Sequence, residues 1–277
     1  MECNLPERPE FSNKGTFGKI LNIAGSEYYT GAAYLSSIAA LKVGCGYVAL
    51  ATSPKVMSAV QSMSPDIVYV PITKVKEIIP KYDVVSIGCG LSVETSTKIL
   101  FKSVLTALAS LDKTVIIDAD GLNILASMKK PSKLPENLII TPHPMEASRL
   151  LNVDIDKILA KPVDYAKKLS KKYSCTTVLK LHSTVVCSKN MELYINDTGN
   201  SSLAKAGTGD ILTGIVAGLS AQKMSNFDAA KLGVYLHGLT GEIASSMLTE
   251  YSVLASDLLK YIPLAIIDIL SKQSDKD

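Results

Sequence analysis

The chain has little of several residue types on which common active sites are built. Its 277 residues include no tryptophan and only three histidines, which lie far apart, so a His-rich metal centre is not expected. Its cysteines are odd in number, form no C-x-x-C pair and stand mostly in apolar runs: Cys3, Cys45, Cys89, Cys175 and Cys187. This pattern predicts reduced, buried thiols, as in a cytoplasmic protein, rather than a disulfide framework.

Long apolar runs and a strong net charge are missing as well. No 18 consecutive residues are apolar without interruption, and residues 1–4 do not begin a signal peptide, so we expect a cytoplasmic protein without a membrane partner. The net charge is only +3. The lysine-rich segment Lys167–Lys172 alternates with apolar positions, which is typical of the solvated face of a helix. No nucleic-acid partner is therefore expected.

Four widespread phosphate-binding and catalytic motifs are also absent. The sequence has no G-x-x-x-x-G-K-[ST], no G-x-G-x-x-G after its first predicted strand, no G-x-S-x-G and no H-E-x-x-H. Any phosphate site must therefore be built on something other than a Walker loop or a Rossmann fingerprint.

What the chain does contain is a regular alternation of strand-like and helix-like segments, with 47% hydrophobic residues. Strands are predicted at residues 19–25, 47–52, 66–70, 84–87, 114–117, 138–140, 177–181, 185–188 and 192–195, and helices at 31–43, from 54, 96–109, 163–173, 211–221, 227–248 and 257–270. This order predicts an α/β fold with a mostly parallel sheet covered by helices on both faces, and with hairpins at one edge. No repeat or linker divides the chain, so residues 1–277 are expected to form a single domain.

Polar and flexible residues follow four of the predicted strands. They are Gly88 with Gly90, Asp118 with Asp120, His143, and the loop before Asp210. Because ligands of open parallel sheets bind outside the carboxyl ends of the strands, these residues predict a single cleft at that edge.

The most informative of these segments is the loop Gly199–Asp210 (G-N-S-S-L-A-K-A-G-T-G-D), which leads into the apolar run Ile211–Ala221. A helix N-terminus offers unpaired N–H groups and a partial positive charge, so Gly207 to Gly209 can wrap a polyphosphate closely. Asp210 then stands where it can accept a proton from a hydroxyl that attacks phosphorus. The same residues also fit an ordinary N-capped helix start.

Two more polar segments each allow a structural and a functional interpretation. In Thr141–Glu146 (T-P-H-P-M-E), Pro144 and Glu146 suit a first helical turn, and His143 either caps the helix or hydrogen-bonds a polar substrate. One carboxylate of the Asp118–Asp120 pair could reach Mg²⁺-bound phosphates, since Mg²⁺ takes one or two carboxylates with waters and phosphate oxygens. A turn or cap explains Asp118 better, which leaves Asp120 as the candidate metal ligand.

The small-residue segments allow packing interpretations as well. Gly25–Ser26 and Gly31–Ala33 permit either close approach to a flat ligand or helix–sheet packing. The segment His237–Gly241 is interpreted as packing, with His237 buried and its hydrogen bonds satisfied.

Taken together, these segments resemble the ADP/ATP-dependent NAD(P)H-hydrate dehydratases, a branch of the ribokinase-like superfamily. The resemblance covers nearly the whole chain, and T-P-H-P-x-E followed by G-N-x-x-L-A-K-x-G-T-G-D is its most specific part. The remaining matching segments are Leu5–Arg8, Lys14–Gly15, Ile23–Ser26, Gly31–Ala33, Ile87–Leu91, Asp118–Asn123, Val178–Lys180 and Tyr235–Gly238.

The resemblance implies a three-layer ribokinase-like fold and a nucleotide-repair enzyme. Such enzymes phosphorylate the ring hydroxyl of the S epimer of hydrated NADH or NADPH (NAD(P)HX) from ADP or ATP with Mg²⁺, and then release phosphate. It implies catalytic roles for Asp210, Gly207 and Gly209. By the same similarity, Ala32, Gly90, His143 and Asp210 line the NAD(P)HX site, and the adenine nucleotide is held by Lys180, Leu181, His182, Ser183, Thr184, Asn200, Thr208 and Gly209. It also implies a homotetramer and a functional link to a separate NAD(P)HX epimerase.

The chain departs from the family pattern at three places. Leu181 and His182 follow Lys180 where Lys-Gly is common, Ala206 replaces a second glycine, and Met145 replaces a frequent glycine at a turn where a left-handed conformation would cost energy. Two other functions share the loop and Asp210: a ribokinase-like vitamin kinase acting on a small hydroxymethyl or hydroxyethyl heterocycle, and a non-catalytic nucleotide sensor.

Overall fold

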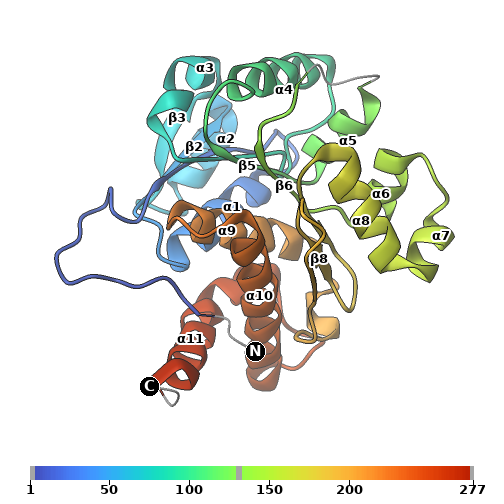
Figure 1. Ribbon diagram of the computed structural model, residues 1–277. Coiled ribbons are helices and arrows are strands. Elements are labelled where there is room, and N and C mark those ends of the chain that lie inside the picture. Colours follow the sequence, from blue (N-terminus) through green and yellow to red (C-terminus); the bar gives the residue numbers. More distant parts are fainter. Residues whose placement is uncertain (1–3, 129–132, 275–277) are drawn as a thin grey trace.

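The computed structural model describes residues 4–128 and 133–274, and its centre is one sheet (Figure 1). The strand order is β3-β2-β1-β4-β5-β6-β7-β8-β9. Strands β1 to β7 pair in parallel, whereas β8 and β9 pair antiparallel at the edge, which confirms the predicted mostly parallel sheet with edge hairpins. The bounds are β1 Lys19–Ile23, β2 Tyr47–Thr52, β3 Val68–Pro71, β4 Val84–Ile87, β5 Thr114–Ile117, β6 Asn137–Ile140, β7 Thr176–Leu179, β8 Val185–Cys187 and β9 Leu193–Ile195.

Helices connect and cover these strands. Their bounds are α1 Thr30–Lys42, α2 Pro54–Gln61, α3 Val75–Ile78, α4 Thr95–Leu108, α5 Asp120–Ser127, α6 Pro144–Leu151, α7 Ile155–Ala160, α8 Pro162–Tyr173, α9 Thr208–Ala221, α10 Asn226–Leu248 and α11 Ala255–Ser274, with short 3₁₀ turns at Ile72–Lys74, Ile79–Lys81 and Ser201–Leu203. The sequence pattern does not indicate α3 or α7, and it predicts a turn after Asp118, where α5 in fact begins at Asp120. All three helices have eight residues or fewer, too short for a clear apolar period.

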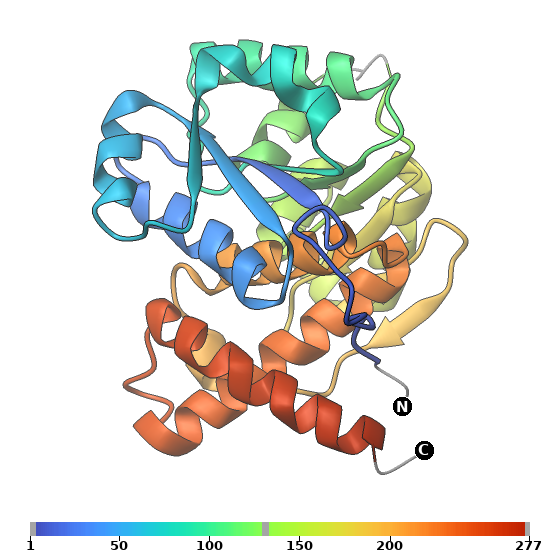
Figure 2. The same cartoon turned by 90° about the vertical axis from the view of Figure 1, so that its left-hand side faces the viewer.

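The core has two parts, one on each face of the sheet, because successive strand side chains point to opposite faces. In β1, Leu21 and Ile23 pack with α4, α5, α6 and α8, whereas Ile20 packs with α9 and α10. Helices α1, α2 and α11 complete the second face. Figures 1 and 2 show the three resulting layers, with α9, α10 and α11 together on one side of the sheet. This confirms the three-layer α/β architecture.

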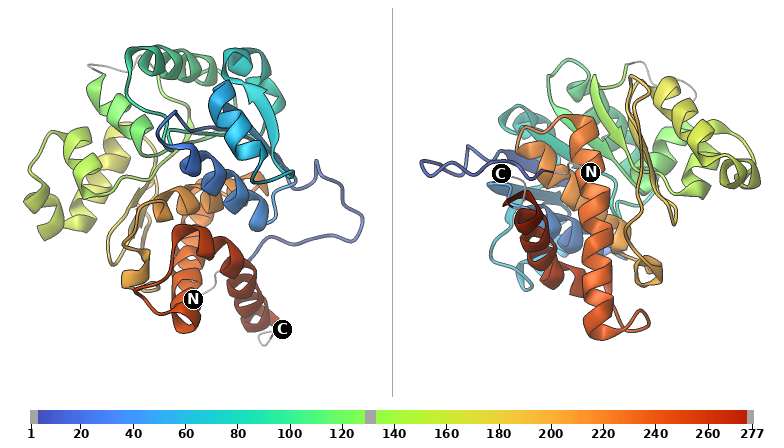
Figure 3. Two further views of the ribbon diagram at one scale, coloured as in Figure 1. Left: turned by 180° about the vertical axis from the view of Figure 1, so that it is seen from behind. Right: turned by 60° about the horizontal axis from the view of Figure 1, so that its bottom comes forward.

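Several smaller predictions can be checked as well. The four cysteines within the described residues are free and buried, as predicted, whereas Cys3 lies outside them. Lys168 and Lys171 are exposed on α8, which confirms the solvated helix face. Among the described residues, none of the helices has the length and apolarity needed to cross a bilayer. The segment before β1 extends away from the sheet in Figures 1 and 3.

Candidate active site

The glycine loop and α9 have the geometry of an anion site. Gly207 is the N-cap residue of α9 with φ +94°, a left-handed conformation that favours glycine, and no side chain caps the helix. The first N–H groups of the helix therefore have no intrahelical acceptor, and that of Thr208 makes only a long contact of 3.4 Å with the carbonyl of Lys205. A Cβ added at Gly209 would meet only Lys180 Nζ, at 3.6 Å, so the space over the loop is open.

Side chains of the loop hold its shape. The Asn200 amide oxygen accepts a hydrogen bond from the N–H of Ser202 (3.1 Å), and its Nδ2 donates to Ser245 Oγ (2.8 Å). The Thr208 hydroxyl donates to the carbonyl of Leu203 at 2.8 Å. Asn200 and Thr208 thus order the loop, which leaves its backbone to face a ligand.

A cavity of about 700 Å³ lies over this loop, between the β7–β8 turn and α10. That volume is within the usual range for small-molecule sites. It brings together residues that the sequence analysis assigned to the site: His143, Lys180, Leu181, His182, Thr184, Asn200, Gly207, Thr208 and Gly209. Ser183, in the same turn, is exposed and is not among the lining residues, and Asp210, Ala32 and Gly90 lie outside the lining as well.

Lys180 is fixed at the floor of the cavity by two carboxylates. Its backbone N–H donates to the carbonyl of Pro142, and its Nζ lies 2.7 Å from Asp118 Oδ1 and 3.9 Å from Glu146 Oε2. Burial alone would lower the pKa of Lys180, but the charges of Asp118 and Glu146 outweigh it and raise the pKa above the ordinary value. The ammonium group therefore stays charged.

Asp118 corrects the expectation of a turn-forming or capping residue. It is 1% exposed, and it accepts hydrogen bonds from Lys180 Nζ and from Thr213 Oγ1 at 2.6 Å. Burial by itself would raise its pKa, but Lys180 and Thr213 together hold the pKa below the usual range. The N-cap residue of α5 is Ala119, with φ +50°, and it makes no side-chain cap. This backbone reversal ends the strand alternation that the sequence analysis used for Asp118 and Asp120.

Asp210 lies beside this ion pair in the first turn of α9. Burial raises its pKa to about 6, the nearby Asp118 charge adds to the rise, and a hydrogen bond from Cys89 opposes it. A carboxylate with this pKa is mostly ionised at neutral pH and can still take up a proton. Asp210 thus has the electrostatic properties of a general base.

The residues predicted for the second substrate outside the cavity lie near Cys89 and Asp210. Gly90 has φ +58°, and a Cβ there would lie 2.8 Å from Ala32 Cβ. The segments that contain Gly90 and Ala32 are therefore packed closely together. Asp120 accepts a hydrogen bond from the N–H of Ser92 at 2.8 Å and interacts electrostatically with Asp210. Cys89, which interacts with Asp210, adjoins Gly90 in the chain, so Gly90, Ala32 and Asp120 all lie in the neighbourhood of Asp210.

His143 has the structural role that the sequence left open. It is the N-cap of α6: its Nδ1 accepts from the N–H groups of Met145 (3.1 Å) and Glu146 (3.3 Å), and the Glu146 carboxylate accepts from the N–H of His143. Its side chain is nevertheless 46% exposed, toward the cavity, so capping and ligand contact are compatible. Met145 is an ordinary helical residue, so the expected left-handed strain is wrong.

The described residues do not contain a ready-made metal cage, because no three His, Cys, Asp or Glu side chains are grouped to hold an ion. Mg²⁺ bound chiefly by phosphates and water needs only one or two carboxylates. Asp120, with one oxygen on Ser92 and its charge close to Asp210, fits an ion that arrives with a nucleotide.

Sequence reasoning missed three members of the site. Thr213 and Cys89 contact Asp118 or Asp210, and Glu146 is buried against Lys180 with a pKa that burial raises to about 7. Only the i, i+3 spacing of Asp210 and Thr213 on one helix could have indicated Thr213. His237 corrects a further expectation: it is buried, but its Nε2 has no hydrogen-bond partner among the described residues.

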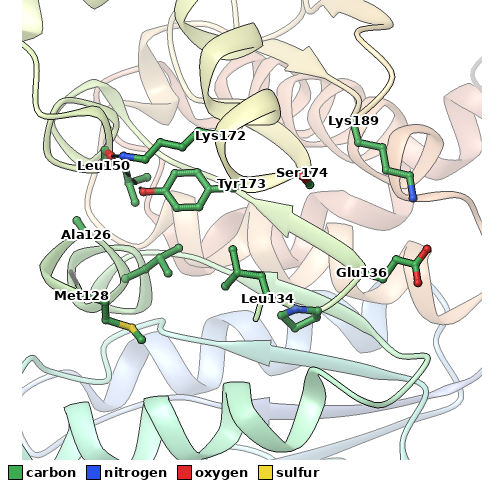
Figure 4. Close-up of a pocket in the computed structure, with 11 residues that line it drawn as sticks. Ala126, Met128, Leu134, Glu136, Leu150, Lys172, Tyr173, Ser174 and Lys189 are labelled. Carbon is green, nitrogen blue, oxygen red and sulfur yellow. Dashed lines mark hydrogen bonds between the residues drawn. The ribbon is translucent and has the colours of Figure 1, made fainter. Parts of the chain in front are cut away.

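A second cavity of about 680 Å³ (Figure 4) lies at the ends of the strands opposite to the glycine loop. Met128, Leu134 and Tyr173 surround it, near the beginnings of β6 and β7. None of the predicted site residues lines it, and ligands of parallel sheets bind at the other edge. We therefore place the candidate active site at the glycine loop alone.

The strand order, the three layers and the glycine loop at the start of α9 define a ribokinase-like α/β protein. The chain belongs to the NAD(P)H-hydrate dehydratase family, whose family model matches residues 20–264. It is 36% identical to the ADP-dependent (S)-NAD(P)H-hydrate dehydratase of Neisseria meningitidis over 258 residues, which are 91% of this chain and 84% of that protein.

Solved structures agree with this assignment. The ADP/ATP-dependent NAD(P)H-hydrate dehydratase of Bacillus subtilis, co-crystallised with ATP and Mg²⁺, superposes with a TM-score of 0.85 at 32% identity, covering 96% of this chain and 94% of that one. Other relatives are longer: the chain matches 52% of the bifunctional NAD(P)H-hydrate repair enzyme of Moorella thermoacetica at 34% identity, with 95% of this chain aligned. It therefore spans about half the length of the bifunctional relatives.

Proposed function

We propose that the protein dehydrates the S epimer of hydrated NADH or NADPH at the expense of ADP or ATP, and so regenerates the reduced nucleotide. The activity in the names of its relatives supports this proposal. The observation that carries it is the buried carboxyl of Asp210, which interacts electrostatically with Lys180 of the cavity and receives a hydrogen bond from Cys89, the neighbour of Gly90 in the chain.

In the first step the ring hydroxyl of the hydrate attacks the terminal phosphorus of ADP. Asp210 takes the hydroxyl proton, a new O–P bond forms, and the bond to the departing AMP oxygen breaks. The N–H groups of Gly207 to Gly209 stabilise charge on the transferred phosphoryl group, and Lys180 adds a fixed positive charge. Mg²⁺, when bound through the phosphates, would neutralise part of the same charge.

In the second step the C–O bond of the phosphate ester breaks, and phosphate leaves with the electron pair of that bond. The ring nitrogen supplies electrons to the carbon, and loss of a proton from the neighbouring ring carbon restores the dihydropyridine. Phosphorylation is needed because hydroxide is a poor leaving group and phosphate a good one. The balance is hydrate plus ADP to NAD(P)H, AMP and phosphate; with ATP the nucleotide product is ADP.

The ligand contacts that we propose are those that the family resemblance implies. Lys180, Leu181, His182, Ser183 and Thr184 hold the adenine nucleotide from the β7–β8 turn, with Asn200, Thr208 and Gly209 opposite. Ala32, Gly90, His143 and Asp210 contact the hydrate, and Asp120 reaches the Mg²⁺ that accompanies the nucleotide.

The wider assignments are also proposals. We infer one catalytic domain over residues 1–277, acting in the cytoplasm together with an NAD(P)HX epimerase; relatives named as bifunctional repair enzymes support that link. We propose a homotetramer, for which the exposed apolar residues Leu264, Ile267 and Leu270 of α11 offer a contact face.

The test is to incubate the purified protein with hydrated NADH, ADP and Mg²⁺. We expect the absorbance of reduced nicotinamide to return, with one AMP and one phosphate released per NADH. No recovery, together with phosphorylation of a thiazole or pyrimidine alcohol, would replace the proposal by a vitamin kinase. Nucleotide binding without turnover of any of these substrates would indicate a sensor.

A further inference from the structure

The cavity contains a polar atom that the proposed reaction does not use. His237 lines the cavity from α10 and is 9% exposed. Its Nε2 is buried and has no hydrogen-bond partner in the part of the chain that the structure describes. Buried polar atoms are nearly always paired, and an unpaired one costs stability. A ligand that brings the missing partner accounts for this exception.

The chemistry of the imidazole specifies which partner is missing. Burial lowers the pKa of His237 to about 4, and a backbone hydrogen bond with Thr208 opposes that shift. The ring is therefore neutral at physiological pH and carries one N–H. The Thr208 contact raises the pKa, as a carbonyl that accepts the ring N–H does, so the unpaired Nε2 is left as an acceptor. Its partner must be an N–H or O–H donor.

The surroundings of His237 indicate which part of a nucleotide can supply that donor. Leu212, Val234 and Gly238 line the cavity together with His237, and Thr198, which packs on Gly238, already donates its hydroxyl to the carbonyl of Tyr235. The first turn of α9 and Lys180 supply the anion-binding groups. A lone pair would repel the oxygens of a phosphate. A wall with apolar side chains and an acceptor that still lacks a donor instead suits a base or a ribose.

We propose that His237 Nε2 accepts a hydrogen bond from the nucleoside part of the bound adenine nucleotide, either from the 6-amino group or from a ribose hydroxyl. His237 is then a specificity-determining residue of the nucleotide site. The inference rests on the proposed function, because it takes this cavity to be the ADP site.

The experiment measures binding of four nucleotides by calorimetry in the presence of Mg²⁺. They are ADP, purine riboside diphosphate, which lacks the 6-amino group, and 2′-deoxy-ADP and 3′-deoxy-ADP. We expect the unaltered protein to bind one of the three analogues about tenfold more weakly than ADP, which identifies the donor. The apolar variant His237→Leu should bind ADP about tenfold more weakly and should lose this discrimination.

A stability measurement separates ligand binding from packing. His237→Leu removes the buried Nε2, which has no partner without ligand, but it also removes the hydrogen bond of the ring with Thr208, and the two effects on stability oppose each other. Its melting temperature should therefore stay within about 5 °C of that of the unaltered protein. Thr240→Val is the matched control: Thr240 is buried on α10, donates to the carbonyl of Leu236 and does not line the cavity. It should leave the discrimination among nucleotides unchanged.

The outcomes distinguish the two proposals. If the unaltered protein binds ADP and repairs the hydrate, but His237→Leu keeps the affinity and the discrimination, the role of His237 is wrong and the proposed function stands. Equal binding of all four nucleotides by the unaltered protein also overturns the role of His237. A protein that does not bind ADP overturns both.

Discussion

The end of β5 and the start of α9 each contribute an aspartate to the site, and the surroundings shift the pKa values of these two carboxyl groups in opposite directions. Asp118, after β5, is fully enclosed, and Lys180 and Thr213 hold its pKa below the usual range. Asp210, in the first turn of α9, has its pKa raised to about 6 by burial and by Asp118. One carboxylate therefore stays ionised as a structural anion, and the other is tuned to exchange a proton near neutral pH.

Asp118 and Asp210 lie close together because a residue of α9 binds Asp118. Thr213 follows Asp210 by about one turn of α9, so its bond to Asp118 fixes the helix that carries Asp210. The same buried charge both positions Asp210 and raises its pKa. Replacing Asp118 should therefore have different consequences from replacing Asp210. Four variants at and around this pair test the difference, in order of decreasing effect.

Asp210→Asn should give the largest loss. The amide keeps the shape but cannot take the hydroxyl proton, so kcat should fall by about a thousandfold while ADP binding is kept. In the unaltered enzyme, kcat should decline as the pH falls below about 6, since Asp210 becomes protonated there. Steady-state kinetics over a pH series check both effects. Unchanged turnover of the variant would remove Asp210 from the mechanism.

Gly209→Val should act on nucleotide binding. The open space above Gly209 is where we place the phosphates, so a branched side chain should weaken ADP binding by about a hundredfold with little change in melting temperature. Calorimetry with ADP and a thermal melt are the measurements. Gly31→Ala is a suitable control, since a Cβ at exposed Gly31 meets nothing within 4 Å. An unaltered ADP affinity in Gly209→Val would move the nucleotide elsewhere.

Asp118→Asn breaks the structural member of the pair. It leaves the Lys180 ammonium without its main partner, so the free energy of unfolding should fall by about 3 kcal/mol, as for other broken buried pairs. Because the Asp118 charge raises the pKa of Asp210, the acid limb of the kcat profile should also move to lower pH. Denaturant titration and the pH profile measure the two. If the acid limb of the kcat profile moves to higher pH or does not move, the Asp118 charge does not raise the pKa of Asp210.

Cys89→Ala should have the smallest effect, and it should shift the acid limb of the kcat profile in the direction opposite to Asp118→Asn. The hydrogen bond from Cys89 lowers the pKa of Asp210, so its loss should move the acid limb to slightly higher pH. The loss of one buried sulfur should cost about 1 kcal/mol of stability. The Asp118→Asn and Cys89→Ala profiles are each other's control, because only a direct effect on Asp210 shifts them in opposite directions.

Most of the fold and the place of the site could be predicted because their signals are local. Strand runs that end in glycine or aspartate indicated the sheet and its ligand-binding edge, and Gly207 to Asp210 indicated the anion site. Helix α5, which begins at Asp120, escaped because the positive φ of Ala119 has no sequence signal in a non-glycine residue. His143 proved to be a cap as well as a cavity residue, which the motif alone left undecided.

The sequence by itself determined the order of strands and helices, the glycine loop and the acid that follows it, because each depends on residues adjacent in the chain. Only the tertiary structure decided the electrostatics of the site. The Asp118–Lys180 pair joins residues 62 apart, and His237 Nε2, which has no partner among the residues that the structure describes, lies where α10 meets the loop. The strength of a charge depends on which groups lie around it and on how much water they exclude, and both are set only when distant segments pack together.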